Sequence, residues 1–194
     1  MKIVKVSIAV ICIMVLLLYI LNPLMVKHNS MQNMYHPKDI VFANRYYKSI
    51  DRGDIIVFRK GKQKHIKRCV ALPGDTVLIR NGKLFVNGIL LHWQSEKKIT
   101  IKKSTEKKGF NDYYFNNWSS LDFGPFVVPK KGMEYNKESY YRNLYLGDSN
   151  SGNSESFNQD YYFFMGDNRE NSIDSRAYGP ISSKDIVGKV YHKL

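Results

Sequence analysis

The sequence predicts a mainly β fold, a folded or barrel-like sheet of short strands, with one N-terminal transmembrane helix. Short apolar runs rich in β-branched residues, bounded by Gly, Pro, Asn and Asp, recur through the chain. Residues 6–26 contain no charged residue, although 24% of the 194 residues are charged. The β pattern and the uncharged stretch together indicate a β domain behind a hydrophobic N-terminus.

Residues 6–26 are long enough to cross a membrane as one helix. A helix of this length measures about 31 Å, against a bilayer core of about 30 Å. A cleavable secretory signal would have an apolar region of about 7–15 residues and then a small-x-small site. No such site occurs in residues 22–28, and a buried core helix would be shorter and would show a polar face. We therefore expect an uncleaved signal anchor.

The charges that flank the anchor predict its orientation. Lys2 and Lys5 precede it without any acidic residue, which favours a cytoplasmic N-terminus, whereas long domains translocate largely regardless of charge. We expect a single-pass protein of the cytoplasmic (inner) membrane with its β domain on the outer, periplasmic or extracellular face. The predicted parts are a short cytoplasmic N-terminus (1–5), the anchor (6–26) and the β domain (27–194).

The β domain is predicted strand by strand. Asn81-Gly82 between two apolar runs indicates a hairpin with a type I′ turn, and Asn87-Gly88 marks the next turn. Residues 92–160 are richer in Lys, Asn, Ser and Tyr, and we interpret them as an elaboration, part strand and part loop. The expected strands are residues 39–43, 54–58, 64–72, 76–80, 83–86 and 161–165.

Composition and motifs exclude several functions. The net charge of +13 suits nucleic acid or an anionic membrane, but no nucleic-acid-binding signature occurs. We predict no metal, because the five histidines are scattered and Cys-x-x-Cys is absent, and no cofactor, because nucleotide-binding loops are absent. Cys12 lies in the anchor and Cys69 in an apolar strand, so no intrachain disulfide is expected. Ser-x-x-Lys matches at Ser95 and Ser104 lie in a lysine-rich stretch and are attributed to chance.

Four short segments remain, and together they resemble a known family. The segments are residues 29–31 (Asn-Ser-Met), 53–58 (Gly-Asp-Ile-Ile-Val-Phe), 66–75 (Ile-Lys-Arg-Cys-Val-Ala-Leu-Pro-Gly-Asp) and 166–176 (Gly-Asp-Asn-Arg-Glu-Asn-Ser-Ile-Asp-Ser-Arg). In this order, behind an anchor, they resemble the bacterial type I signal peptidases, the S26 family of serine–lysine proteases. The resemblance covers about residues 24–88 and 161–190, and the last segment is its most specific part.

The resemblance implies a role for individual residues. Ser30 occupies the position of the nucleophile, with its main-chain N–H as an oxyanion donor, and Lys67 that of the general base. Ser172 matches the residue that orients the lysine amine, and Asp174 and Arg176 match an ion pair that braces the site. The positions that line the substrate pockets or adjoin them are Met31, Ile56, His65 and Ile66.

The chemistry of this set is coherent. A serine hydroxyl needs a base to become a good nucleophile, and serine–lysine pairs are one solution. The lysine must be neutral, although its reference pKa is about 10.4, and burial in an apolar strand would lower that pKa. Ser30 follows the apolar run by four residues, which would hold the site near the membrane surface, where the cleavage site of a signal peptide emerges.

The sequence departs from the family pattern around the nucleophile. The family usually has Ser-Met-x-Pro-Thr, whereas residues 30–34 are Ser-Met-Gln-Asn-Met. Two residues before the nucleophile, where a Ser or Thr hydroxyl often supplies a second oxyanion donor, this chain has His28. His28 is therefore the candidate for that second donor, or the donor is missing.

The leading hypothesis is a membrane-bound serine endopeptidase that cleaves N-terminal signal peptides. Its partners would be preproteins with small-x-small, Ala-x-Ala-like cleavage sites, membrane lipid and the secretion machinery, and not nucleic acid. One alternative is a protease dedicated to a single secretion or pilus substrate, suggested by residues 30–34. Another is a non-catalytic membrane-tethered β domain that binds exported chains or anionic lipid.

Overall fold

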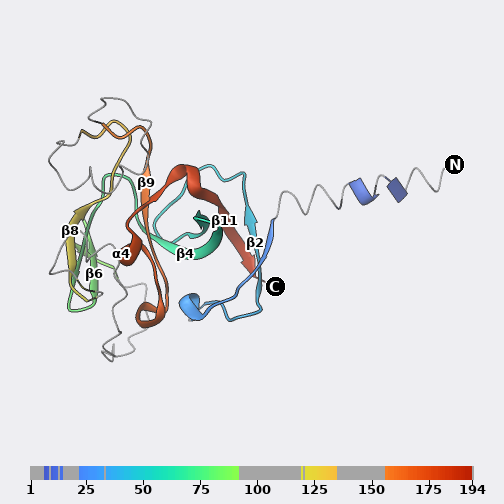
Figure 1. Ribbon diagram of the computed structural model, residues 1–194, viewed down its shortest axis with the longest axis horizontal. Coiled ribbons are helices and arrows are strands. Elements are labelled where there is room, and N and C mark those ends of the chain that lie inside the picture. Colours follow the sequence, from blue (N-terminus) through green and yellow to red (C-terminus); the bar gives the residue numbers. More distant parts are fainter. Residues whose placement is uncertain are drawn as a thin grey trace.

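A computed structural model of the chain describes residues 7, 8, 10–12, 14, 22–32, 34–91, 119, 121–134 and 156–193 (Figure 1). These residues form two β-sheets and a few single helical turns. The strands are β1 (Pro23–Met25), β2 (Ile40–Asn44), β3 (Ile55–Lys60), β4 (Gln63–Ala71), β5 (Thr76–Arg80), β6 (Lys83–Val86), β7 (Ile89–Leu90), β8 (Phe123–Val127), β9 (Tyr161–Met165), β10 (Ile181–Ser182) and β11 (Ile186–Lys193). The turns are η1 (Asn29–Met31), η2 (Arg169–Asn171), α4 (Ser175–Tyr178) and η3 (Ser183–Asp185).

The two sheets are antiparallel and open. The larger has the order β1-β2-β11-β3-β4-β9-β10, and the smaller has the order β7-β6-β5-β8. Figure 1 shows β6 and β8 at one side of the molecule and β2 and β11 at the other, with β9 between them. The mainly β prediction is therefore confirmed, but among the described strands neither sheet closes on itself, so a barrel-like arrangement is not what these residues form.

All six predicted strands are present, with ends within two residues of those expected. Both Asn-Gly turns have the positive φ angles that their residues favour, 49° and 74° at Asn81-Gly82 and 53° and 78° at Asn87-Gly88. The alternation of apolar and polar residues and the turn-forming residues were sufficient to predict these strands, because turn formers lie within a few residues of both ends of each strand.

The sequence did not predict β11, which lies in the centre of the larger sheet between β2 and β3. Its pairing shifts register between Ile186 and Gly188 against β3, and between Val190 and His192 against β2. These irregularities interrupt the alternation by which a strand is recognised. Strand β8, within the predicted elaboration, pairs with β5, whereas residues 92–118, 120 and 135–155 of that elaboration lie outside the described residues.

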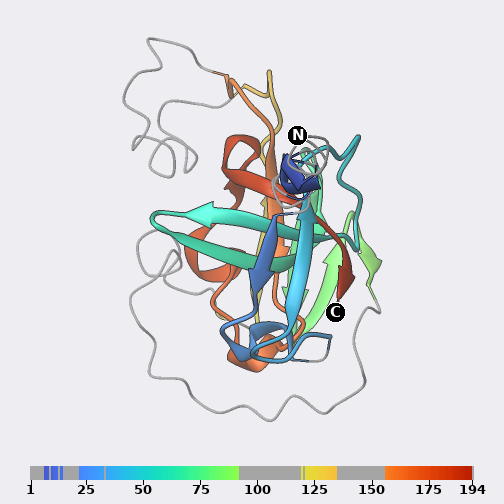
Figure 2. The ribbon, with the colours of Figure 1, turned by 90° about the vertical axis from the view of Figure 1, so that its right-hand side faces the viewer.

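The N-terminal end of the sheet corrects one predicted boundary. Most of residues 6–26 lie outside the described part of the chain, so the anchor stays a prediction; residues 7, 8, 10–12 and 14 are helical. Among the described residues there is no helix with the length and apolar character needed to span a membrane. Pro23–Met25 form β1, which runs beside β2 (Figure 2), and Val26 is buried. Any helix therefore ends before Pro23.

Apolar side chains fill both faces of β3 and β4. On one face Ile56, Phe58 and Cys69 pack with Phe164 of β9. On the other, Ile55 and Val57 pack with a cluster that includes Met31 of η1. Because β4 is covered on both faces, a polar side chain on this strand is removed from water unless it lies near the strand end.

Candidate active site

Ser30 lies in the single 3₁₀ turn η1, which follows β1. The turn is closed by the Gln32 N–H, which donates to the Asn29 carbonyl at 3.0 Å. Met31 is 1% exposed and fastens the turn to the core, while Ser30 beside it stays partly exposed. One apolar residue next to the serine thus holds the turn in place and leaves the hydroxyl free to face β4.

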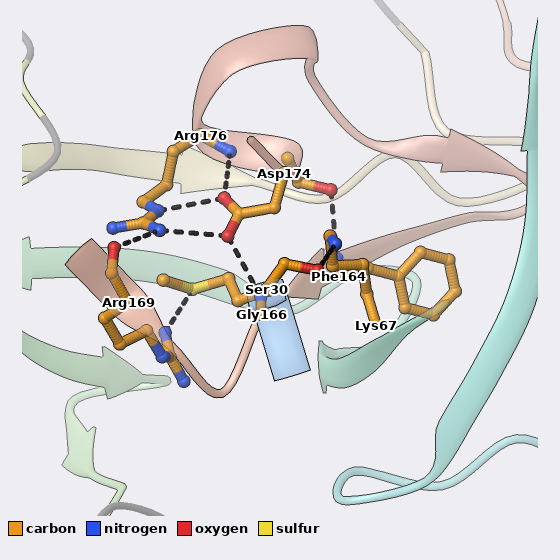
Figure 3. A network of polar contacts seen from close by, with 9 residues as sticks. Ser30, Lys67, Phe164, Gly166, Arg169, Asp174 and Arg176 are labelled. Atoms are coloured by element: carbon orange, nitrogen blue, oxygen red, sulfur yellow. Dashed lines mark hydrogen bonds and ion pairs between the residues drawn. The ribbon is translucent and has the colours of Figure 1, made fainter. Parts of the chain in front are cut away.

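Lys67 projects from β4 toward Ser30, and the two side chains meet (Figure 3). Lys67 Nζ lies 2.5 Å from Ser30 Oγ, and the lysine is 4% exposed. Burial lowers the pKa of Lys67; nearby Asp174 opposes this shift and Arg176 adds to it. A buried amine of lowered pKa in contact with a hydroxyl is the arrangement that a lysine base and a serine nucleophile require.

Gly166, directly after β9, brings the C-terminal segment (residues 166–176) against η1, the turn that carries Ser30. A Cβ at Gly166 would lie 2.2 Å from Ser172 Oγ and 2.5 Å from the Ser30 carbonyl oxygen, both closer than atoms can approach. The Gly166 N–H donates to Asp174 Oδ2 at 3.0 Å. Only glycine therefore allows the two segments to approach this closely.

Asp174 and Arg176 form a buried ion pair behind the lysine (Figure 3). Arg176 Nε and Nη2 donate to the two carboxylate oxygens, each at 2.9 Å, and the residues are 0% and 6% exposed. Burial raises the pKa of Asp174. The Arg176 charge and the hydrogen bond from the Gly166 N–H lower it by more, so the pKa of Asp174 lies below its ordinary value. Arg176 also donates to the Arg169 carbonyl at 2.9 Å, which ties η2 to the pair.

Ser172 lies beside this network. Its Oγ is buried and, within the described part of the chain, has no hydrogen-bond partner. The predicted hydrogen bond to Lys67 is thus not formed in this structure, and the orienting role of Ser172 stays a prediction.

The predicted substrate-binding residues fall into two groups. Met31 and Ile56 are 1% and 0% exposed and pack in the core, a placement that the sequence did not predict. His65 and Ile66 are partly exposed, and the His65 ring stacks on Phe58 with a centroid distance of 5.6 Å. Burial and the Lys67 charge lower the pKa of His65. Contact with substrate stays a prediction for all four.

His28 precedes η1 in an extended conformation, with φ −131° and ψ 164°. Its side chain is exposed and makes no capping hydrogen bond to the turn. Its role as the second oxyanion donor stays a prediction. Among the described residues there is also no group of three or more His, Cys, Asp or Glu that could hold a metal ion.

Sequence reasoning did not assign roles to three residues that the structure brings to the site. Arg68, next to Lys67, donates to both carboxylate oxygens of Asp167, at 2.8 and 2.6 Å, and to the Gly53 carbonyl at 2.6 Å. Asn168 contacts the η1 turn, through the Ser30 and Asn29 carbonyls. All three lie in the four segments that carried the resemblance, so the motif itself contained the signal.

Comparisons with known proteins agree with these segments. The family described as "Signal peptidase, peptidase S26" matches residues 1–193. Signal peptidase I P of Bacillus subtilis subsp. natto is 32% identical over 93% of this chain and 80% of its own length. Signal peptidase I S of Bacillus subtilis (strain 168) has the same identity and coverage. A crystal structure of a signal peptidase I from Enterococcus faecalis V583 aligns with a TM-score of 0.40 at 24% identity, covering 74% of this chain and 98% of that one.

Proposed function

Because the chain belongs to the signal peptidase S26 family, we propose that it is a membrane-bound serine endopeptidase that cleaves N-terminal signal peptides from exported preproteins with a Ser30–Lys67 dyad. The contact between Lys67 Nζ and Ser30 Oγ carries the proposal. Lys67 is buried and its pKa is lowered, so a larger fraction of its amine is neutral at a given pH than for an exposed lysine.

The first half of the reaction acylates Ser30. Neutral Lys67 takes the hydroxyl proton as Ser30 Oγ bonds to the scissile carbonyl carbon, and the carbonyl oxygen becomes an oxyanion. The Ser30 main-chain N–H is the proposed donor to that oxyanion, with His28 as the candidate second donor. The Lys67 ammonium then gives its proton to the leaving amine, the C–N bond breaks, and the signal peptide remains as an ester on Ser30.

The second half releases the signal peptide. Lys67, neutral again, takes a proton from water as the water oxygen attacks the ester carbonyl carbon. Collapse of the second tetrahedral intermediate breaks the bond to Ser30 Oγ, which regains its proton from Lys67. The cycle thus returns both residues to their starting protonation states. The buried Asp174–Arg176 pair supports the site by holding Gly166 against the nucleophile turn.

The proposed substrates carry small residues at small-x-small, Ala-x-Ala-like sites. The proposed location is the outer face of the cytoplasmic membrane, with the uncharged stretch from residue 6 up to β1 as the anchor and membrane lipid and secretion machinery as neighbours. Processing of a single dedicated substrate is the second candidate, because residues 33 and 34 are Asn and Met where the family usually has Pro and Thr, and Met34 Sδ accepts from Arg68 Nη2 at 3.1 Å.

Cleavage of a preprotein with an Ala-x-Ala site by the full-length protein in detergent tests the proposal. We expect Ser30→Ala and Lys67→Ala to abolish cleavage while leaving the protein folded. Lys64→Ala is the matched control, because Lys64 is an exposed lysine on the same strand. Undiminished cleavage by Lys67→Ala would rule out the serine–lysine mechanism. Cleavage of one preprotein among many unrelated ones would favour the dedicated protease.

A further inference from the structure

Asn168, in the C-terminal segment, donates three hydrogen bonds to the turn that carries Ser30. The Asn168 main-chain N–H donates to the Ser30 carbonyl at 3.0 Å. Its side-chain Nδ2 donates to the Asn29 carbonyl at 3.0 Å and to Gln32 Oε1 at 3.3 Å. Asn168 thus bonds to the nucleophile and to residues on both sides of it.

We propose that Asn168 is a positioning residue that clamps the Ser30 turn, with Gln32 as the outer partner of the clamp. The inference rests on the proposed function and adds a device for holding the nucleophile in place. Asn168 would contact neither the substrate nor the reacting atoms. It acts through the Ser30 peptide unit, whose orientation directs the side chain toward Lys67.

The turn needs such support because its own hydrogen bonding is sparse. A single 3₁₀ turn has poorer hydrogen-bond geometry than an α-helix and seldom persists alone. This chain also has Asn33 where the related family usually has proline, so the backbone restriction that a proline ring would supply there is absent. The Asn168 amide bridges the carbonyl at the start of the turn and the side chain just after its end.

The clamp is itself held in place. Asp167, one residue earlier, is fixed by two hydrogen bonds from Arg68 of β4. Gly166, before that, donates to buried Asp174. The Asn171 N–H, three residues later, donates to the Asn168 carbonyl at 3.1 Å. Because Arg68 is the neighbour of Lys67, the clamp places the nucleophile and the base relative to the same strand.

Kinetics of the full-length protein in detergent test the positioning role. We expect Asn168→Ala to lower kcat about tenfold while KM changes little, because two side-chain hydrogen bonds are lost and the reacting atoms are misplaced. Gln32→Ala should lower kcat about twofold, and Gln32→Glu, which keeps the acceptor, should restore it. When Asn168 is already alanine, adding Gln32→Ala should not lower kcat further, because Gln32 acts through its hydrogen bond from Asn168. Asn171→Ala is the control, because it removes an exposed asparagine side chain of the same segment and keeps the main-chain N–H that donates to Asn168.

Amide hydrogen exchange separates the clamp from the proposed function. In Asn168→Ala, the amides of Gln32, Met34 and Tyr35, which are bonded within the turn, should exchange about tenfold faster than in wild type, with global stability and the pH–rate midpoint unchanged. Unchanged exchange would overturn the clamp whether or not the protein cleaves preproteins. Faster exchange without any wild-type cleavage would uphold the clamp and reject the peptidase assignment.

Discussion

Lys67 and Arg176 are equally buried cations with opposite electrostatics. They are 4% and 6% exposed, and for both, burial is the largest influence and lowers the pKa. Arg176 has a carboxylate partner that raises its pKa above the ordinary value, whereas the Lys67 amine contacts a neutral hydroxyl and its pKa stays lowered. The partner in contact with a buried basic group thus decides whether its pKa lies above or below the ordinary value.

Breaking the ion pair should have the largest effect. Arg176→Met leaves the Asp174 carboxylate buried without its partner, and we expect the free energy of unfolding to fall by about 3–5 kcal/mol. Denaturant unfolding measures this loss. Arg59→Met, which removes an exposed arginine, is the control. A loss below about 1 kcal/mol would mean that Asp174 does not depend on Arg176 for its charge.

Gly166→Ala tests whether the close approach of Gly166 to the Ser30 turn is needed for cleavage. The new Cβ would collide with Ser172 Oγ and the Ser30 carbonyl, so the segment around residue 166 and the Ser30 turn must move apart. We expect kcat/KM for preprotein cleavage to fall about a hundredfold, since a misplacement of about 1 Å can cost that much. Gly61→Ala in the exposed β3–β4 turn is the control, because it adds the backbone strain of alanine at a φ of 59° but no collision, with no atom within 4 Å of the added Cβ. Retained activity would refute the steric argument.

The pH dependence of cleavage reports the pKa of Lys67. Because the proposed base is neutral Lys67, kcat/KM should rise about tenfold per pH unit below that pKa and level off above it. The lowered pKa places the midpoint below the ordinary value of about 10.4. A rate profile measured from pH 6 to 10.5 locates it. A midpoint at or above the ordinary lysine value would contradict the electrostatic environment described for Lys67.

Ser30→Asp makes the Lys67 site resemble that of Arg176. A carboxylate against the amine should raise the pKa of Lys67 and form an ion pair, and the substitution removes the proposed nucleophile. A raised folded-state pKa adds stability below the unfolded lysine pKa, and that stability is lost as pH rises through the folded pKa. Relative to Ser30→Asn, we expect about 1 kcal/mol of extra stability at pH 8, lost as the pH rises through the pKa of Lys67 in the Ser30→Asp variant. Equal stability of the two variants would show that the side chain at position 30 does not set the pKa of Lys67.

The local sequence was sufficient to predict those elements whose conformation depends on residues a few positions away. The six predicted strands and both Asn-Gly turns follow from alternation and turn chemistry within a few positions. Strand β11 escaped prediction because its two register shifts hide the alternation. The burial of Met31 and Ile56 was also unforeseen, because a motif position does not tell which sheet face a side chain occupies.

The sequence by itself determined six of the strands, the two Asn-Gly turns and the four segments that place the chain among the signal peptidases. Tertiary structure alone decided that Ser30 and Lys67, 37 positions apart, are in contact, and that Gly166 and Asn168 close the site from the far end of the chain. The reason is physical. Strand formation is local, whereas burial of an amine and its distance to a hydroxyl depend on how separate elements pack, and that packing sets the pKa on which the chemistry depends.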